Sequence, residues 1–371
     1  MSSLENALKK IDWDFPNSNT NGNINSIHPY PAKFISEIPR ALIETIGLPK
    51  NTWVLDPFCG SGSTLVEAQL AGIPSIGIDI NPIACLLTEV KTQNLSEDFL
   101  DSAKKVVDKA KKNKKSAIPE IPNLDHWFKK EIQVIIAQLS AQINSVQDKE
   151  IRDALRISLS SILVRVSNQE SDTRYAAIEK SLDAEKVYSL FLESAEKIYT
   201  AKSKYKPKTK IAEIICKDIL QVKPAEIKHP VGLVIASPPY PNAYEYWLYH
   251  KYRMYWLGFD PVEVKQKEIG ARAHFFKKNH HTEKDFQNQM QIVLELLNAS
   301  VVNGGHICIV VGRSKIHGKI VDNAETIIEI GKALNFKLVA NLTRQIASSR
   351  KTFNLSHANI KTENLIVFEK I

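Results

Sequence analysis

A run of apolar residues that ends at two consecutive prolines constrains the fold of this chain more than any other stretch. Val231 to Ile235 predicts a buried strand, and Ser237-Pro238-Pro239-Tyr240 follows it almost at once. Because proline has no backbone N–H to donate, the chain must leave the sheet at Ser237 in an extended turn. A hydroxyl, free carbonyls and an aromatic ring therefore gather at the carboxyl end of a strand, where open α/β sheets bind ligands. A proline-rich turn that only caps a strand has the same composition.

A second stretch, far upstream, has the order strand, glycine loop, helix. An apolar strand ends near Leu55, and Gly60 and Gly62 allow a ligand to approach the loop backbone closely. The spacing of these glycines differs from the G-x-G-x-x-G of dinucleotide-binding proteins. About twenty residues further on, a second strand ends at Asp79. A carboxylate at this position can accept hydrogen bonds from both ribose hydroxyls of a bound nucleoside.

Together these stretches resemble the motifs of S-adenosylmethionine-dependent DNA methyltransferases that modify exocyclic amines. The segment from Asp56 to Thr64, which reads D-P-F-C-G-S-G-S-T, is similar to their cofactor loop. Ser237 to Tyr240 is similar to their catalytic motif, most closely that of the cytosine-N4 enzymes. His28 to Phe34, which reads H-P-Y-P-A-K-F, resembles a further cofactor-side motif.

The resemblance implies S-adenosyl-L-methionine as cofactor and an α/β, Rossmann-like methyltransferase fold with a mixed, mostly parallel sheet. It assigns catalysis to Ser237, Pro238, Pro239 and Tyr240. The residues that it places at the cofactor are His28, Pro31, Lys33, Phe34, Asp56, Phe58, Gly60, Gly62, Thr64, Asp79, Ile80 and Asp218. The imidazole of His28 and the ammonium of Lys33 are the candidates for the methionine carboxylate of the cofactor. The implied reaction extrudes a base and transfers a methyl group to its amino nitrogen.

The chain divides into four parts by composition. Residues 1–27, with asparagine at every second position from 17 to 25, predict a flexible polar lead or a loop over the substrate. Residues 28–95 form the cofactor-binding half of the methyltransferase domain, and residues 211–371 form its catalytic half. Between them, residues 96–210 lose strand signals and show apolar residues at helical spacing. We therefore expect a helical insertion between the second and third strands, with a possible role in target recognition.

Two further parts of the catalytic half have a clear pattern. Asn242 to Leu257 predicts a helix with more aromatic residues than one buried face needs, and Trp247 is the one most expected in the core. The others are candidates to line a pocket for an extruded base. Near the end of the chain, Phe336 to Leu342 and Asn364 to Phe368 predict an antiparallel pair of strands.

Composition limits the classes of partner and site. The net charge of +8 and the isoelectric point near 9.0 favour a polyanionic partner. The four cysteines lack C-x-x-C spacing, and we expect reduced thiols and no metal site. Without a signal peptide or an apolar run of membrane length, the sequence predicts a cytoplasmic protein.

Polar and basic segments outside the motifs are candidates for contact with nucleic acid. Asn168, Gln169 and Arg174 lie in a polar segment of the insertion, and such side chains read base edges through paired hydrogen bonds. An interhelical loop with a capping serine or aspartate has the same composition. The basic candidates for phosphate contact are Lys277, Lys278, Arg313, Arg344, Arg350 and Lys351. A solvated connector explains Lys277 and Lys278 equally well.

The target atom is predicted from Ser237. A serine hydroxyl both donates and accepts hydrogen bonds, whereas a carboxylate only accepts and would repel N3 and O2 of cytosine. Because this argument does not exclude adenine, the choice leans on the resemblance, which implies N4-methylcytosine, with N6-methyladenine as the alternative. An RNA methyltransferase and a non-catalytic nucleic-acid-binding subunit are the alternatives from other classes. We expect double-stranded DNA as partner and a cognate restriction endonuclease as a further one, and the sequence leaves the oligomeric state open.

Overall fold

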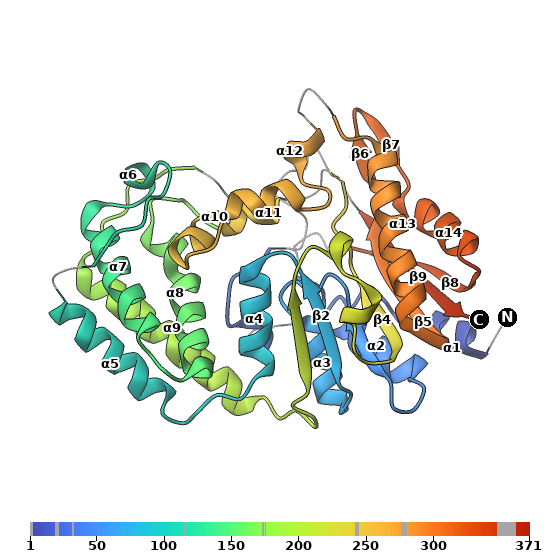
Figure 1. Ribbon diagram of the computed structural model, residues 1–371, viewed down its shortest axis with the longest axis horizontal. Coiled ribbons are helices and arrows are strands. Elements are labelled where there is room, and N and C mark those ends of the chain that lie inside the picture. Colours follow the sequence, from blue (N-terminus) through green and yellow to red (C-terminus); the bar gives the residue numbers. More distant parts are fainter. Residues whose placement is uncertain are drawn as a thin grey trace.

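A seven-stranded sheet forms the centre of the described structure (Figure 1). The computed structural model describes residues 3–18, 22–31, 33–113, 116–172, 174, 176–241, 245–275, 280–346 and 361–371. The strand order is β3-β2-β1-β4-β5-β9-β8. The strands are β1 (Trp53–Asp56), β2 (Ser75–Asp79), β3 (Ala212–Cys216), β4 (Val231–Ala236), β5 (Val301–Gly312), β8 (Phe336–Gln345) and β9 (Thr362–Lys370).

The sheet is mostly parallel, as the sequence predicts. Strands β3, β2, β1, β4 and β5 run parallel, and β9 lies antiparallel between β5 and β8. The apolar strand that ends at the double proline, β4, occupies the middle and is buried along its whole length. This arrangement confirms the Rossmann-like methyltransferase fold and the antiparallel pair at the end of the chain.

Helices cover both faces of the sheet. From β4, Leu233 and Ile235 pack with α1 (Ser3–Lys9) and α2 (Glu37–Ile46) on one face. Val234 and Ala236 pack with α13 (Glu283–Ser300) and α14 (Asn323–Ala333) on the other. The alternation follows from the two-residue period of a strand. Helices α3 (Ser63–Ala71) and α4 (Pro82–Thr92) follow β1 and β2 in the chain.

The N-terminal lead is folded where the sequence predicts flexibility. Helix α1 buries Leu8 completely, and the indole Nε1 of Trp13 donates to the Leu8 carbonyl at 2.9 Å. Ile24 and Ile27, in and after a short 3-10 helix, are buried as well. A few apolar residues among many polar ones are enough to order this segment, because the rest of the protein supplies the apolar surface on which they pack.

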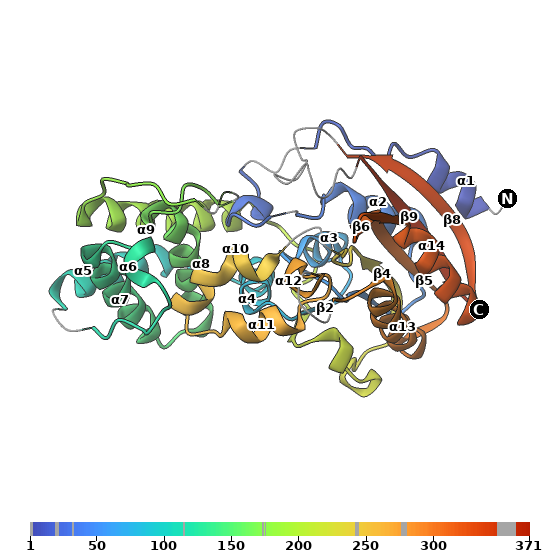
Figure 2. The same ribbon diagram turned by 90° about the horizontal axis from the view of Figure 1, so that it is seen from above.

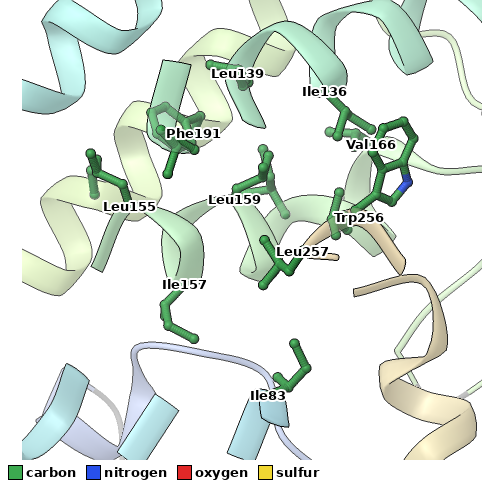
Figure 3. Packing of buried hydrophobic residues seen from close by; sticks show 14 of the residues in the cluster. Ile83, Ile136, Leu139, Leu155, Ile157, Leu159, Val166, Phe191, Trp256 and Leu257 are labelled. Carbon is green, nitrogen blue, oxygen red and sulfur yellow. The ribbon is translucent and has the colours of Figure 1, made fainter. Parts of the chain in front are cut away.

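A helical lobe lies beside the sheet region, next to α4 (Figures 1 and 2). It is inserted between β2 and β3, as predicted. Its helices are α5 (Phe99–Lys112), α6 (Leu124–Trp127), α7 (Lys130–Asn144), α8 (Lys149–Val166) and α9 (Ala184–Lys204). Leu155, Leu159 and Phe191 pack in its interior, and Ile157 points toward Ile83 of α4 (Figure 3). The lobe and α4 therefore share one apolar core.

The aromatic helix after the double proline joins the lobe to the sheet region. Helix α10 (Tyr246–Trp256) is followed by α11 (Pro261–Lys267) and α12 (Arg272–Phe275). Trp256 lies in the core of the lobe (Figure 3), and Trp247 is buried as expected. A short antiparallel hairpin, β6 (Ser314–Ile316) and β7 (Lys319–Val321), completes the elements. No helix in the described part of the chain is long and apolar enough to cross a membrane.

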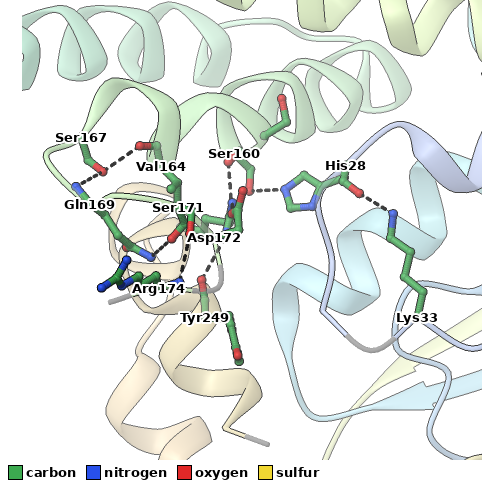
Figure 4. A network of polar contacts seen from close by, with 12 residues as sticks. His28, Lys33, Ser160, Val164, Ser167, Gln169, Ser171, Asp172, Arg174 and Tyr249 are labelled. Carbon is green, nitrogen blue, oxygen red and sulfur yellow. Dashed lines mark hydrogen bonds and ion pairs between the residues drawn. The ribbon is translucent and has the colours of Figure 1, made fainter. Parts of the chain in front are cut away.

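A buried arginine ties α10 to the lobe. The guanidinium of Arg253 is 2% exposed and donates to the carbonyls of Ser160 and Tyr249 at 3.1 and 2.9 Å. It also forms an ion pair with Asp172, in the polar segment that follows α8 (Figure 4). A buried charge that loses its counter-ion destabilises a fold strongly.

We expect Asp172→Ala to lower the free energy of unfolding by roughly 3 kcal/mol, because the Arg253 guanidinium stays buried without its carboxylate. Urea unfolding followed by circular dichroism measures the change. The control is Glu179→Ala, which removes an exposed partner of Lys129 and should shift the free energy by less than about 0.5 kcal/mol. Equal effects of the two substitutions would contradict this interpretation.

Candidate functional site

The carboxyl ends of four parallel strands meet at one cavity. Asp56 ends β1, Asp79 ends β2, Asp218 follows β3, and Ser237 follows β4. Of the residues predicted for the cofactor or for catalysis, those that line the cavity are Lys33, Phe34, Asp56, Phe58, Gly60, Asp79, Ile80, Asp218, Ser237 and Pro239. The cofactor loop and the catalytic motif, about 180 residues apart in the chain, thus face the same space.

The two glycines of the loop have different tasks. Gly60 has a φ of +49° and lines the cavity, and a Cβ there would lie 3.4 Å from the Tyr30 hydroxyl. Gly62 has a φ of +78°, and its Cβ would come within 2.7 Å of the Thr88 hydroxyl on α4. Gly60 therefore leaves its own part of the cavity wall without a side chain. Gly62 allows the first residues of α3 to pack closely against α4.

Asp79 is held rigidly at the end of β2. Its Oδ2 accepts a hydrogen bond from the Gly60 backbone N–H and its Oδ1 accepts one from the Asn81 N–H, both at 2.8 Å. Burial raises the pKa of Asp79 to about 6 and that of Asp56 to about 7. Both carboxyls are therefore poised to ionise fully when a positively charged or hydrogen-bond-donating ligand arrives.

A third buried acid, Glu268, lines the cavity without any signal in the sequence that predicts it. It lies directly after α11, and burial raises its pKa to about 8. Its carboxylate oxygens accept the backbone N–H groups of Tyr246 and Trp247 at 2.9 and 2.7 Å. Tyr246, from the first turn of α10, also lines the cavity, so one of the predicted pocket aromatics is found there.

The catalytic motif meets the cavity at two of its four residues. Ser237 and Pro239 line it, whereas Pro238 is buried behind them. The Tyr240 hydroxyl donates to Glu363 Oε1 of β9 at 2.5 Å, which orients the ring from its far end. The motif is therefore anchored to the antiparallel edge of the sheet.

Comparisons with known proteins agree with this geometry. The family model for DNA methylases, of the N6/N4 type, matches residues 4–90. The type II methyltransferase M.BsoBI of Geobacillus stearothermophilus is 28% identical over 298 residues, which cover 67% of this chain and 55% of that protein. The type II methyltransferase M.MvaI of Kocuria varians is 26% identical, over 46% of this chain and 41% of that one.

Over these residues the chain is similar to DNA methylases of the N6/N4 type. It spans about half the length of the two curated relatives named above. Among solved structures, TrmN from Thermus thermophilus aligns over 95% of this chain and 52% of its own, with 10% identity and a TM-score of 0.35.

S-adenosylmethionine is the cofactor that this similarity implies, and the residues of the cavity fit it. The glycine loop leaves room at Gly60 for close backbone approach. Asp79, which lines the cavity at the end of β2, is the candidate for the ribose hydroxyls. Three buried carboxyls with raised pKa values suit a ligand that carries a sulfonium and an ammonium. Lys33, whose pKa burial lowers to about 8, lines the same cavity and is the candidate for the carboxylate of the cofactor.

The structure contradicts the prediction for His28. The imidazole is completely buried outside the cavity lining, and its Nε2 lies 2.9 Å from the Ser160 hydroxyl of α8 (Figure 4). Burial lowers its pKa well below the usual value, so it is neutral. Its carbonyl, together with that of Asn25, accepts from the Lys33 ammonium, at 2.8 and 2.9 Å. His28 therefore packs the lobe against the motif and positions Lys33.

Three other predicted cofactor residues lie outside the cavity lining. Thr64 is completely buried in the first turn of α3, and Gly62 packs against α4. Pro31 is partly exposed. The loops that carry the motifs border the cavity, but burial within each loop decides which of its residues reach it.

Among the residues predicted to contact nucleic acid that the structure describes, three of five donate from their side chains to backbone carbonyls within the protein. Gln169 is 6% exposed and its amide donates to the Ser171 carbonyl at 2.7 Å (Figure 4). The Asn168 amide donates to the His126 carbonyl at 3.1 Å. These bonds contradict a direct role of the two amides in reading bases and favour the alternative of an interhelical loop. Arg174, 69% exposed and paired with Glu170, is the member of this segment that faces solvent.

Arg344 is a clear correction among the basic candidates. It is buried, donates to the Trp13 carbonyl at 2.9 Å and forms an ion pair with Glu363. It therefore supports the acceptor of the Tyr240 hydroxyl and is not available for phosphates. Arg313 is 64% exposed beside Asp322 and stays a candidate. Lys277, Lys278, Arg350 and Lys351 lie outside the described residues.

We expect Asp79→Ala to weaken binding of S-adenosylmethionine by on the order of 100-fold, because hydrogen bonds to a charged acceptor are lost. Isothermal titration calorimetry measures the affinity. Asp101→Ala, on the exposed face of α5, is the control and should bind as the wild type does. Wild-type affinity in Asp79→Ala would sink the assignment of the ribose site.

The affinity for S-adenosylmethionine should rise with pH between about 6 and 8, the range of the raised pKa values of Asp79, Asp56 and Glu268. In the free protein these carboxyls take up protons as the pH falls through that range. A bound cation favours their ionised form, so binding releases protons and becomes tighter as the pH rises. Calorimetry in two buffers with different ionisation enthalpies counts the protons. A constant affinity without proton release would contradict the role of the three acids.

Proposed function

We propose that this protein transfers a methyl group from S-adenosylmethionine to the exocyclic N4 of cytosine in double-stranded DNA. The observation that carries the proposal is the shared cavity, in which Ser237 opens onto the same space as Gly60 and Asp79. Cofactor and amino nitrogen can therefore approach each other without movement of the sheet. The net charge of +8 supports a polyanionic substrate.

The residues of the catalytic loop would prepare a poor nucleophile. The lone pair of an exocyclic amine is delocalised into the ring, so the nitrogen must become more tetrahedral before it attacks. Hydrogen bonds from the amino group to the Ser237 hydroxyl and the Pro238 carbonyl favour that geometry. The ring of Tyr240, anchored through its hydroxyl to Glu363, is the platform for stacking. The bound cofactor supplies an electrophilic methyl group, and the amino proton leaves to solvent.

We place cytosine ahead of adenine because Ser237 to Tyr240 resembles the motif of the cytosine-N4 enzymes, and the serine is compatible with that choice. Its hydroxyl can accept from the amino group or donate to a ring acceptor, whereas a carboxylate in its place would repel N3 and O2 of cytosine. The type II methyltransferases that the chain resembles support a modification enzyme with its own recognition sequence. A restriction endonuclease that cuts the same sequence is the partner this proposal implies.

DNA from cells that express the wild-type protein should contain N4-methylcytosine, measured by digestion to nucleosides and mass spectrometry. Long-read sequencing of the same DNA identifies the modified sequence. Ser237→Ala is the matched variant: it keeps the cofactor residues and should lose most of the modification, by about 100-fold. Detection of N6-methyladenine alone would overturn the base assignment. Methylated nucleosides found only in RNA would overturn the substrate class.

A further inference from the structure

One short segment touches the cofactor cavity, the catalytic loop and the aromatic helix at the same time. Residues 268–271 connect α11 to α12; Lys267 at the end of α11, together with Glu268 and Ile269, lines the cavity. Glu268 is 4% exposed and Ile269 is 5% exposed. A buried charged side chain in a connection between helices needs a physical reason.

The first reason is the start of α10. The first backbone N–H groups of a helix have no partner inside the helix. Glu268 supplies partners for two of them, with Oε1 2.9 Å from the Tyr246 nitrogen and Oε2 2.7 Å from the Trp247 nitrogen. Because both oxygens are used, the carboxylate sets the position and direction of the first turn. That turn carries Tyr246 into the cavity.

The second reason is the catalytic loop. Gly270 has a φ of +73°, and a Cβ there would lie 2.7 Å from the carbonyl oxygen of Tyr240 and 2.9 Å from its carbon. The backbone of the segment therefore lies directly against the end of the catalytic motif. Only glycine allows both this φ and this approach.

The third contact is with the cavity itself. Glu268 faces the same space as Asp79, and the charge of Asp79 is one of the groups that raise the pKa of Glu268. The other groups that act on it are the carboxylate of Glu245 and the N–H groups of Tyr246 and Trp247. A ligand that donates hydrogen bonds to Asp79 and brings an ammonium into the cavity offsets this repulsion and favours the ionised carboxylate that both N–H groups need.

We propose that Glu268 is a positioning residue that links occupation of the cofactor cavity to the placement of α10 and of the catalytic loop. The bound ligand favours the ionised form of Glu268, and the ionised carboxylate accepts the hydrogen bonds of the first turn of α10. Gly270, two residues further on, lies against the backbone of Tyr240. The assignment of α10 and Tyr240 to the base pocket rests on the proposed function. The link from cavity to helix is independent of it.

The first test measures the helix without DNA. Amide hydrogen exchange at residues 245–248 should slow when S-adenosylhomocysteine binds the wild type, because the Glu268 bonds tighten. In Glu268→Gln one acceptor oxygen is replaced by a donor that faces a backbone N–H. The slowing should disappear when both proteins are compared at saturating S-adenosylhomocysteine, and the affinity should fall as well, because coupling between ligand and carboxylate is reciprocal. Unchanged slowing in Glu268→Gln would overturn the proposal.

The second test measures the reaction on a duplex that contains the modified sequence. Glu268→Gln should lower the rate at saturating cofactor and DNA by about tenfold or more, because misplaced groups react slowly. A loss that saturating cofactor restores would mean that Glu268 only forms a wall of the cavity, and would overturn the proposal. The control is Glu263→Gln, on the exposed face of α11, which should react as the wild type does.

Gly270→Ala displaces the connection between α11 and α12 through a steric clash instead of a lost hydrogen bond. It tests the proposal if Glu268→Gln does not fold. Its methyl group must push the Tyr240 backbone away, so the rate at saturation should fall without loss of cofactor affinity. A wild-type rate in Gly270→Ala would contradict the contact with the catalytic loop. If the wild type binds S-adenosylhomocysteine and shows the slowed exchange but methylates no DNA, the proposed function fails and the link stands.

Discussion

Hydrogen bonds from backbone N–H groups to three buried carboxyls are the interaction on which the site depends. Asp56 accepts from Phe58 at 3.0 Å, Asp79 accepts from Gly60 and Asn81, and Glu268 accepts from the first turn of α10. Each bond fixes a loop that forms one wall of the cavity. Burial strengthens these hydrogen bonds but also disfavours the ionised form of each carboxyl. A cationic ligand stabilises the ionised forms, and the cavity therefore suits a cation.

The helical lobe is part of this framework and not an appendage. Ser160 of α8 meets His28 through its hydroxyl and Arg253 through its carbonyl. One turn of one helix therefore supports both the segment ahead of the glycine loop and the helix after the catalytic motif (Figure 4). The polar segment that ends at Asp172 adds the counter-ion for Arg253. The position of the lobe thus bears on the geometry of the cavity.

The far side of the catalytic loop is supported by residues from both ends of the chain. Tyr240 donates to Glu363 of β9, Glu363 pairs with Arg344 of β8, and Arg344 donates to the Trp13 carbonyl. Trp13 is held in turn by Leu8 of α1. This sequence of contacts explains why the N-terminal residues fold on the sheet, although their composition predicts a flexible lead.

The sequence by itself indicated the mostly parallel sheet, the glycine loop, the strand that ends at the double proline, the antiparallel pair near the end of the chain and the place of the helical insertion. These depend on local periodicity and on glycine and proline, whose effects act within a few residues. The tertiary structure alone decided which polar side chains face the cavity. Lys33 reaches it and His28 does not, although they are only five positions apart in the chain. Glu268 and Arg344 gained their roles from burial and from partners distant in the chain, 331 residues away for Arg344 and Trp13. Such partners depend on packing between elements, which no local pattern encodes.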